Sequence, residues 1–186
     1  MDNLPSWILR ARGPILLFGE TGTGKSTFAK IIHDKICPSK PFICVNLATL
    51  NENLLEGELF GHSKGAFTGA INDKKGYFEA VGKGTLFLDE IGELSLQSQK
   101  KLLLLLEEGV FFKLGSTKEE EFKGKIITAT NKNLFNMVKE KAFREDLYYR
   151  LNCFSFEIDP IRKNDKRKRY LINYYFQKFR AIYKKE

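Results

Sequence analysis

Short apolar runs alternate along the chain with stretches whose apolar residues recur at helical spacing. Each run has four or five residues, too few for a helix and continuous enough for a strand that is buried on both faces. Strands that alternate with helices predict an α/β fold with a five-stranded parallel sheet between helices, and ligands then bind at the carboxyl ends of the strands. The predicted strands are Ile15–Phe18, Phe42–Val45, Thr85–Leu88, Ile126–Ala129 and Phe154–Ile158.

The helix predicted over Leu96–Glu108 has a signal at each end. Ser95 precedes it, a residue type that favours the N-cap, and Gly109 follows it, the residue type that most often ends a helix. The other stretches with helical character are Lys25–Ile36, Glu52–Phe60 and Asn133–Glu140.

Two segments depart from this alternation. Gly61–Gly76 is too rich in glycine for a helix interior and too long for a tight turn, so it is predicted to be a protruding loop. Val110–Lys123 is predicted to be a two-stranded hairpin around Gly115 and Ser116. After Pro160 a basic run and an amphipathic stretch follow, so we expect residues 1–160 to form one domain and residues 161–186 to begin a second subdomain.

The composition limits the class of protein. Of 186 residues, 42% are hydrophobic, which is enough for one core and far from the composition of a disordered chain. No apolar run approaches the roughly 18 residues that cross a bilayer, and the first residues lack the pattern of a secretory signal. Three widely spaced cysteines support neither a disulfide framework nor a zinc site. We therefore expect a cytoplasmic protein without a membrane partner.

The net charge of +8 raises the question of nucleic-acid binding. Residues 162–186 carry ten basic and two acidic residues, which accounts for the whole excess, so residues 1–161 are neutral overall. A solvated connector or helix face explains such a run more simply than a phosphate-binding patch does, although both readings remain open.

The strongest local motif lies between the first predicted strand and the first predicted helix. It has the pattern G-x-x-x-x-G-K-[ST] of a phosphate-binding loop. In such a loop the glycines allow main-chain N–H groups to surround phosphate oxygens, the lysine reaches the β- and γ-phosphates, and the last hydroxyl ligates Mg²⁺. A turn that merely connects strand and helix has no need of Lys followed by Ser. The predicted nucleotide-binding residues are Gly19, Glu20, Thr21, Gly22, Thr23, Gly24, Lys25 and Ser26.

Hydrolysis also requires a carboxylate that holds the metal and a group that activates water. Asp89 and Glu90 follow the third predicted strand, which delivers them to the same sheet edge as the phosphate loop. Asp89 is predicted to hold Mg²⁺ with Ser26, and Glu90 to orient and deprotonate the water. The alternative is a pair of solvated acids at a strand end.

The nucleotide is predicted to be ATP. Asn131-Lys132-Asn133-Leu134 starts like the N-K-x-D box that recognises guanine, but Leu134 has no carboxylate for the guanine ring. Guanine selectivity therefore has no source in this segment.

The glycine-rich loop contains the hexapeptide GAFTGA, the signature of the sigma-54-dependent transcription activators, which are AAA+ ATPases. The chain resembles this family from about Pro14 to Pro160, through Glu58–His62, Gly84–Leu94 and Phe143–Leu151. The resemblance implies an AAA+ P-loop NTPase core that contacts sigma-54 through the loop, with Phe67 and Thr68 at its tip. The contact residues implied are Gly65, Ala66, Phe67, Thr68, Gly69 and Ala70.

The resemblance also assigns roles around the nucleotide. It implies that Asn46 holds the catalytic Glu90 in a switchable position, that Thr130 and Asn131 sense the γ-phosphate, and that Arg144 and Arg150 act on the nucleotide of a neighbouring subunit. Without it, the two arginines would be an ordinary pair on a charged helix surface. A homo-oligomeric ring follows, a hexamer when the lid is present.

Departures from the family pattern lie mainly near the carboxyl end. Leu47 replaces a common Cys, Ser26 replaces a frequent Glu, and Ile161–Asn164 replaces most of a Pro-Leu-Arg-Glu-Arg pattern. Residues 161–186 are expected to form a basic connector and the first helix of a truncated helical lid, so that DNA is bound only through domains missing from this chain.

The predicted function is that of the ATP-hydrolysing core of a sigma-54-dependent activator, which remodels the sigma-54 RNA polymerase complex. The alternative is a non-catalytic nucleotide-binding fragment that lacks a functional lid. A protein that binds DNA directly would rest on the basic tail alone.

Overall fold

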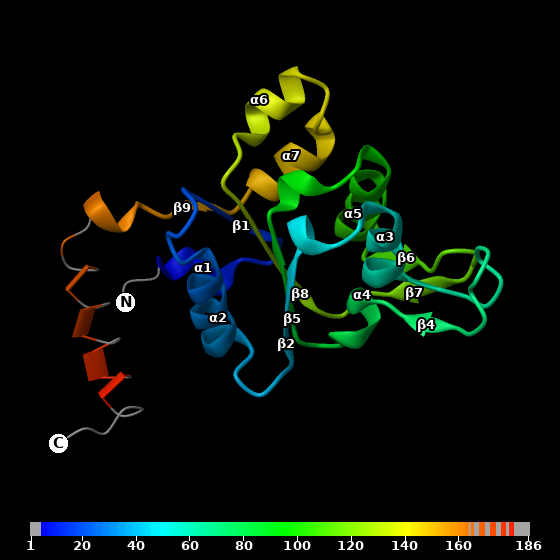
Figure 1. Cartoon of the computed structure of the whole chain (residues 1–186), viewed down its shortest axis with the longest axis horizontal. Coiled ribbons are helices and arrows are strands. Elements are labelled where there is room, and N and C mark those ends of the chain that lie inside the picture. Colours follow the sequence, from blue (N-terminus) through cyan, green and yellow to red (C-terminus); the bar gives the residue numbers. More distant parts are fainter. Residues whose placement is uncertain are drawn as a thin grey trace.

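A single parallel sheet organises the molecule. The computed structural model describes residues 5–163 and, beyond them, residues 165, 168, 169, 172, 173, 176, 177, 179 and 180. Five strands pair in the order β2-β5-β8-β1-β9, and every pairing is parallel (Figure 1). This confirms the predicted sheet. The strands are β1 (Ile15–Phe18), β2 (Phe42–Asn46), β5 (Thr85–Asp89), β8 (Lys125–Thr130) and β9 (Ser155–Glu157).

Helices cover both faces of the sheet because successive strand residues point to opposite sides. Leu17 and Phe87 lie in one core, under α1 (Ser6–Arg10) and α2 (Lys25–Ile36). Their neighbours, among them Leu16, lie in the other core. That second core is covered by α3 (Glu52–Phe60), α4 (Tyr77–Ala80), α5 (Leu96–Glu108), α6 (Leu134–Lys139) and α7 (Glu145–Asn152).

The predicted helix signals are confirmed at α5. The hydroxyl of Ser95 accepts a hydrogen bond from the N–H of Ser98 at 3.3 Å, and Gly109 has φ +72° in the C-cap position. The helices α1, α4 and α7 were not among the predicted ones, because they have only five, four and eight residues and show less than three turns of periodicity. The described residues also form three 3₁₀ turns, at Leu47–Thr49, Ile91–Glu93 and Ile161–Lys163.

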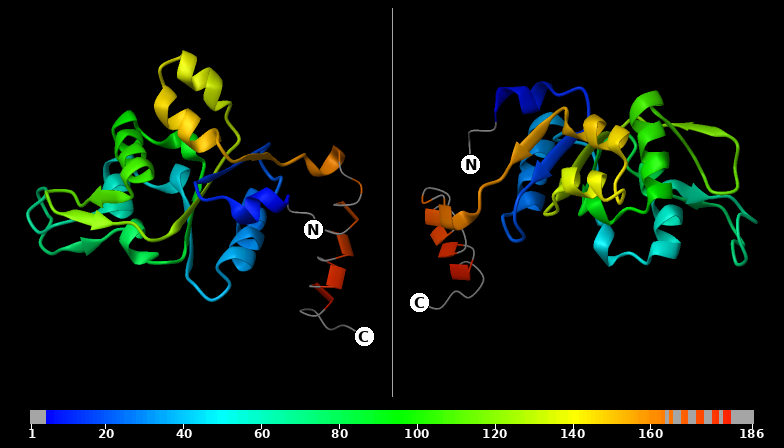
Figure 2. Two further views of the ribbon diagram at one scale, coloured as in Figure 1. Left: turned by 180° about the vertical axis from the view of Figure 1, so that it is seen from behind. Right: turned by 90° about the horizontal axis from the view of Figure 1, so that it is seen from above.

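Two excursions leave the sheet on the same side (Figure 1). The predicted hairpin is confirmed as β6 (Val110–Phe112) paired antiparallel with β7 (Glu119–Glu121). The segment predicted as an uninterrupted loop instead begins and ends on two short antiparallel strands, β3 (Gly61–His62) and β4 (Lys74–Lys75). We call residues 63–73 between them the GAFTGA loop. Views from behind and from above show that the two excursions lie side by side (Figure 2).

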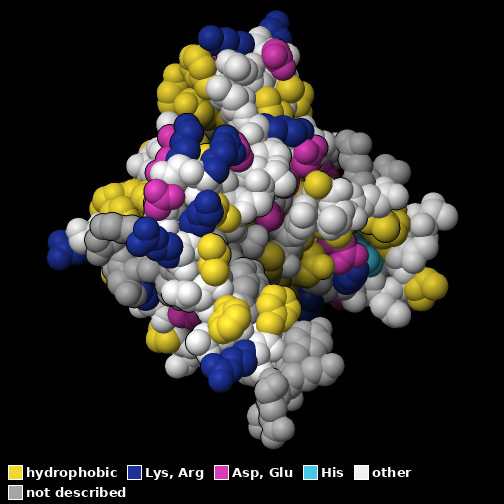
Figure 3. Space-filling model, turned by 60° about the vertical axis from the view of Figure 1, so that its left-hand side comes forward, with side chains coloured by type: hydrophobic (Ala, Val, Ile, Leu, Met, Phe, Trp, Pro, Cys, Tyr) yellow, Lys and Arg dark blue, Asp and Glu magenta, His cyan; other side chains and the backbone are white. Residues whose placement is uncertain are grey.

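Most of the predicted lid helix lies outside the described residues. The 3₁₀ turn at Ile161–Lys163 is the last continuous element that the structure describes. On the face seen in Figure 3, basic and acidic side chains are interspersed, in agreement with the neutral charge of residues 1–161. In the described part of the chain, no helix is both long and apolar enough to cross a membrane.

Candidate functional site

The carboxyl ends of neighbouring strands bring the predicted nucleotide-binding residues to one edge of the sheet. Phe18 at the end of β1 pairs with Thr130 at the end of β8, and Asn46 at the end of β2 pairs with Asp89 at the end of β5. The phosphate loop therefore starts beside the turn that follows β8. This is the edge at which parallel sheets bind ligands.

The phosphate loop has the main-chain geometry that encloses an anion. Gly19, Gly22 and Gly24 have φ of +154°, +79° and +79°, values that residues with a side chain rarely adopt. A Cβ on Gly19 would lie 2.6 Å from the carbonyl oxygen of Ile158, so this position requires glycine. Gly24 is the N-cap of α2 and provides no side-chain cap, which leaves N–H groups of the first turn for a ligand.

Lys25 lies at the centre of this loop with only 6% of its side chain exposed. Its ammonium donates to the carbonyl oxygen of Gly19 at 3.2 Å and lies 3.8 Å from Oε1 of Glu90. A buried ammonium needs anionic or polar partners, and these weak contacts are ones that phosphate oxygens can replace.

Ser26 and Asp89 meet across the site. The hydroxyl of Ser26 donates to Oδ2 of Asp89 at 3.4 Å. The described residues contain no cluster of three or more His, Cys, Asp or Glu side chains that could hold a metal by themselves. One hydroxyl and one carboxylate fit the way in which Mg²⁺ is held with nucleotides, where phosphate oxygens and water supply the remaining ligands.

Glu90 has an unusual main-chain conformation. Its φ of +57° and ψ of +54° are left-handed, which costs a non-glycine residue on the order of 1 kcal/mol. The carboxylate accepts a hydrogen bond from the N–H of Asn131 at 3.2 Å and is 17% exposed. The strained residue thus lies between the lysine of the phosphate loop and the turn after β8.

Asn131 and Thr130 differ in what their side chains do. The side-chain amide of Asn131 donates to the hydroxyl of Thr21 at 2.8 Å, so it reaches the phosphate loop. Thr130 is buried, and its hydroxyl accepts a hydrogen bond from the N–H of Lys132 at 3.0 Å. Thr130 therefore shapes the turn that presents Asn131.

Asn46 lies beside the site without bonding to Glu90 in the described structure. Its side-chain oxygen accepts a hydrogen bond from the N–H of Ala48 at 3.0 Å and so caps the 3₁₀ turn that leads to α3. The interaction with Glu90 that the resemblance implies stays a prediction; in it the side-chain nitrogen of Asn46 would donate to the carboxylate.

Glu20 connects the phosphate loop to the segment after β9. Both of its carboxylate oxygens accept hydrogen bonds from the guanidinium of Arg162, at 2.5 and 2.6 Å. These bonds hold the pKa of Glu20 below its usual value. Both side chains are more than half exposed, so the pair sets geometry more than it adds stability.

Arg144 and Arg150 lie at opposite ends of α7 and have different partners. Arg144 forms a two-pronged pair with Asp146, at 3.0 and 2.6 Å, and this pair lowers the pKa of Asp146. Arg150 instead donates to the carbonyl oxygen of Leu106, at 2.8 Å, near the end of α5. Residues six apart do not share a helix face, so the two guanidinium groups are not neighbours.

The GAFTGA loop is closed by its own main chain. The N–H of Gly65 donates to the carbonyl of Ala70 at 2.8 Å, and the N–H of Ala70 donates to the carbonyl of Phe67 at 3.0 Å. Phe67 is 47% exposed, and its ring meets the ring of His62 edge-on at a centroid distance of 4.9 Å. Thr68 and its neighbour Gly69 are exposed, whereas Ala70 is buried. Their role in a contact stays a prediction.

Sequence reasoning missed Ile71. It follows the hexapeptide directly and is 74% exposed, the largest exposure among the described large apolar side chains. The sequence contained a signal for this exposure: Ile71 is followed by four polar residues, Asn72, Asp73, Lys74 and Lys75, which offer no apolar side chain to cover it.

Comparison with protein families gives a match over most of the chain. The model described as "Sigma-54 interaction domain" matches residues 5–157. The chain is 48% identical over 173 residues to the Nif-specific regulatory protein of Herbaspirillum seropedicae, covering 92% of this chain and 32% of that protein. It is 47% identical over 173 residues to the regulatory protein AtoC of Escherichia coli, covering 92% and 38%. The chain thus spans about a third of the length of these curated relatives.

Solved structures agree with this match. NtrX from Brucella abortus in complex with ADP superposes with a TM-score of 0.83 at 29% identity, over 94% of this chain and 38% of NtrX. The complex of NtrX with ATP gives a TM-score of 0.73 at 31% identity, over 82% and 34%. Hsp104 with ATPγS and casein superposes with a TM-score of 0.59 over 80% of this chain and 29% of Hsp104. At 19% identity this likeness shows the fold alone. The predicted AAA+ fold is confirmed.

Proposed function

We propose, from the premise that this chain belongs to the Sigma-54 interaction domain family of sigma-54-dependent activators, that it binds and hydrolyses ATP to remodel sigma-54 RNA polymerase. The observation that carries the proposal is the convergence of Lys25, Asp89 and Glu90 at the edge of the sheet that follows β1 and β5. Each group has the chemistry that phosphoryl transfer requires.

ATP binding is assigned to the phosphate loop. Lys25 would exchange its bonds to loop carbonyls for the β- and γ-phosphate oxygens, and the open side of Gly22, where nothing lies within 4 Å, leaves room for them. Ser26 and Asp89 would hold Mg²⁺. Bound Mg²⁺ supplies charge neutralisation at the transferring phosphoryl group.

Glu90 would activate the attacking water. Its carboxylate is held by the N–H of Asn131, and binding of phosphate to Lys25 removes the opposing ammonium from its other oxygen. The freed oxygen can then accept the proton of the water. Asn131 would sense the γ-phosphate, since it already contacts Thr21 of the phosphate loop.

Hydrolysis would depend on assembly into a ring. Arg144 is the better candidate for an arginine that acts on a neighbouring subunit, because the hydrogen bonds of its guanidinium go to a carboxylate at the start of the same helix, that of Asp146. Arg150 would contribute less directly, since its bond to Leu106 fixes α7 against α5. An arginine supplied across an interface stabilises charge in the transition state.

The state of the nucleotide would reach the GAFTGA loop through α3. Asn46 caps the 3₁₀ turn that begins at Leu47, this turn leads into α3, and α3 ends where β3 begins the stem of the loop. If the side chain of Asn46 turns so that its amide nitrogen donates to Glu90 when the γ-phosphate changes, its oxygen leaves the N–H of Ala48, the turn loses its cap and α3 can shift.

The test is capture of sigma-54 in defined nucleotide states. With ADP plus a metal fluoride that mimics the transferring phosphoryl group, we expect stronger capture than with ATP or ADP. Thr68→Ala should lose capture and keep ATP hydrolysis, because Thr68 is exposed on the GAFTGA loop and takes no part in the bonds described above for Lys25, Asp89 and Glu90. Equal capture by both proteins in every state would refute the proposed role of the loop.

We also propose that residues 1–160 are the ATPase core and residues 161–186 the connector and the start of a lid. Any binding of DNA by the basic tail should be weak, non-specific and steeply salt-dependent. The alternative of a non-catalytic, nucleotide-binding interaction fragment predicts sigma-54 capture without release of phosphate, which a turnover assay on the same samples distinguishes.

A further inference from the structure

The two excursions from the sheet are joined to each other by main-chain bonds. The N–H of Leu114, in the turn of the hairpin, donates to the carbonyl of Gly61 at 2.9 Å, and the N–H of Ser63 donates to the carbonyl of Leu114 at 3.0 Å. His62 and Leu114 form a parallel bridge. The turn of the hairpin is therefore an additional strand-like partner for the stem of the GAFTGA loop.

The next residue of the hairpin touches the hexapeptide itself. Gly115 has φ +72°, and a Cβ built on it would lie 2.7 Å from Cβ and 2.8 Å from Cα of Ala66. Carbon atoms in contact lie about 3.5 to 4.0 Å apart, so no side chain fits between the two segments. The absence of a side chain at Gly115 is thus what allows Ala66 to lie where it does.

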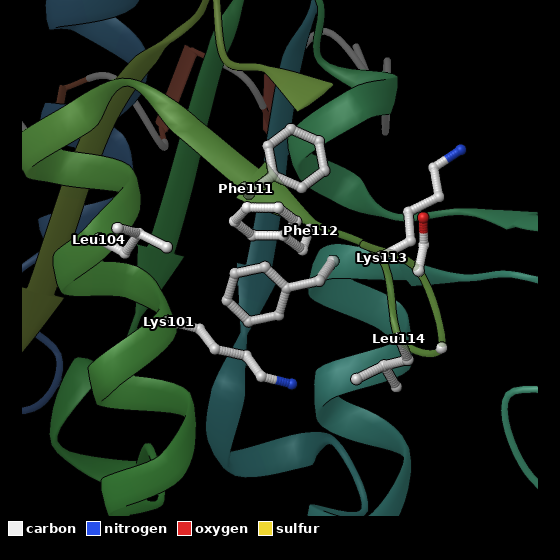
Figure 4. A pocket seen from close by; sticks show the side chains of 9 residues that line it. Lys101, Leu104, Phe111, Phe112, Lys113 and Leu114 are labelled. Carbon is white, nitrogen blue, oxygen red and sulfur yellow. The ribbon is translucent and has the colours of Figure 1, made fainter. Parts of the chain in front are cut away.

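The hairpin is the better anchored of the two partners. Phe111 is buried in the core that α3 to α7 cover. The ammonium of Lys113 lies 2.8 Å from a carboxylate oxygen of Glu79, on α4. The pKa of Lys113 is raised by this hydrogen bond to Glu79. Figure 4 shows Lys101 and Leu104, from α5, on one side of a cavity of about 250 Å³, with Lys113 and Leu114 on the other.

The loop is the more easily displaced partner. Gly65 and Gly69 flank the tip, and nothing lies within 4 Å of the position of a Cβ on either. A side chain at position 115 would therefore push Ala66, and with it the adjoining Phe67, away from the hairpin. The edge-on contact between Phe67 and His62 would be lost with that displacement.

We infer that Gly115 is a positioning residue for the GAFTGA loop: its bare main chain is the surface against which Ala66 rests, and it sets the direction in which Phe67 and Thr68 face a partner. The inference rests on the proposed function for the identity of that partner, sigma-54. The contact between Gly115 and Ala66 is independent of it.

The substitution Gly115→Ala tests the inference, with Gly109→Ala as its matched control. Gly109 directly precedes strand β6, Gly115 follows that strand by three residues, and both have φ +72°, but nothing lies within 4 Å of a Cβ on Gly109. The two variants therefore carry the same left-handed strain, and only Gly115→Ala adds the collision with Ala66.

Two measurements separate the inference from the proposed function. The first is the rate of tryptic cleavage after Lys64, which reports the position of the loop without any partner. We expect Gly115→Ala to be cleaved at least about fivefold faster than the parent protein, and Gly109→Ala at a rate closer to the parent. The second is capture of sigma-54 with the transition-state mimic, which should fall about tenfold in Gly115→Ala while ATP hydrolysis is kept.

The double variant Gly115→Ala/Ala66→Gly removes one of the two colliding atoms and should restore part of the protection from trypsin. Cleavage after Lys64 that is equal in Gly115→Ala and the parent protein would overturn the inference. A parent protein that captures no sigma-54 in any nucleotide state would overturn the proposed function instead, and the cleavage comparison would still decide the role of Gly115.

Discussion

Asn131 donates its side-chain amide to the hydroxyl of Thr21 at 2.8 Å while its main-chain N–H donates to Glu90 at 3.2 Å. One residue after β8 thus contacts both the phosphate loop and the proposed base. The arrangement makes the position of Glu90 depend on the conformation of the phosphate loop.

Thr21→Val should separate catalysis from binding. Valine has the shape of threonine but cannot accept the hydrogen bond from Asn131, so we expect turnover to fall about tenfold and nucleotide affinity to change less than about threefold. Thr21→Ser keeps the hydroxyl and should restore turnover. Steady-state kinetics and titration with a fluorescent ATP analogue provide the two numbers, and an equal loss in both would show that Thr21 acts through binding.

Lys25→Ala should lower ATP affinity at least about a hundredfold, because Lys25 is the lysine that the phosphate loop encloses. Lys30→Ala, on the same helix, removes an exposed lysine that pairs with Asp34 and is the matched control. Calorimetric titration of the three proteins decides. Unchanged ATP affinity in Lys25→Ala would show that the phosphate loop does not bind the nucleotide.

Glu90→Gln should bind ATP and lose about 10²- to 10⁴-fold in turnover, since the amide keeps the shape and can still accept from Asn131 but cannot act as a base. Glu93→Gln changes a nearby exposed carboxylate that pairs with Lys132 and should keep turnover. Phosphate release is the measurement. Comparable turnover in Glu90→Gln would assign the base elsewhere.

A mixing experiment can test whether Arg144 acts across a subunit interface. Arg144→Ala should lose at least about 10³-fold in turnover, and Lys25→Ala should be inactive. In a mixture, a Lys25→Ala subunit still offers Arg144 to the intact nucleotide site of an Arg144→Ala neighbour, so part of the activity should return. No recovery at concentrations where the parent protein is active would contradict a role in trans.

His33 should make stability depend on pH. It is 1% exposed, its Nδ1 lies 2.9 Å from the hydroxyl of Thr85, and its pKa is lowered mainly by burial and further by Lys30, against a smaller opposite effect of Asp34. Because the unfolded chain then binds a proton that the folded protein excludes, the free energy of unfolding should fall as pH drops below about 6.5.

His33→Gln keeps a polar group beside Thr85 and removes this titration. Denaturant unfolding from about pH 7 to about pH 5 should therefore show a steeper loss in the parent protein than in the variant. Parallel curves would show that His33 does not control the dependence.

Local signals predicted the sheet and the longer helices well. The bounds of α2, α3 and α5 agree with the prediction because periodicity over nine or more residues, with Ser95 and Gly109 at the ends of α5, outweighs local ambiguity. The stem strands β3 and β4 have two residues each, and their pairing depends on distant main-chain groups that no local pattern encodes.

In the candidate site, too, the sequence predicted some features and missed others. Motif spacing predicted that the phosphate loop, Asp89 and Glu90 share one edge, because parallel strands deliver their ends together. It did not predict that Asn46 caps a 3₁₀ turn, that Arg150 binds a carbonyl of α5 or that Ala70 is buried. Each depends on a partner that tertiary structure brings close.

The strand order also sets the sequence of events by which the protein can fold as it leaves the ribosome. Every strand pair in the five-stranded sheet joins residues that are far apart in sequence. Strand β2 pairs with β5, and β1 pairs with β8 and β9, so that residues 15–18 form their last pairing with residues 155–157. The phosphate loop after β1 therefore acquires its geometry only when nearly the whole domain has been synthesised. Until then the apolar strands of the unfinished sheet are exposed. Nascent chains that stop before about residue 157 should depend on chaperones and fail to bind nucleotide.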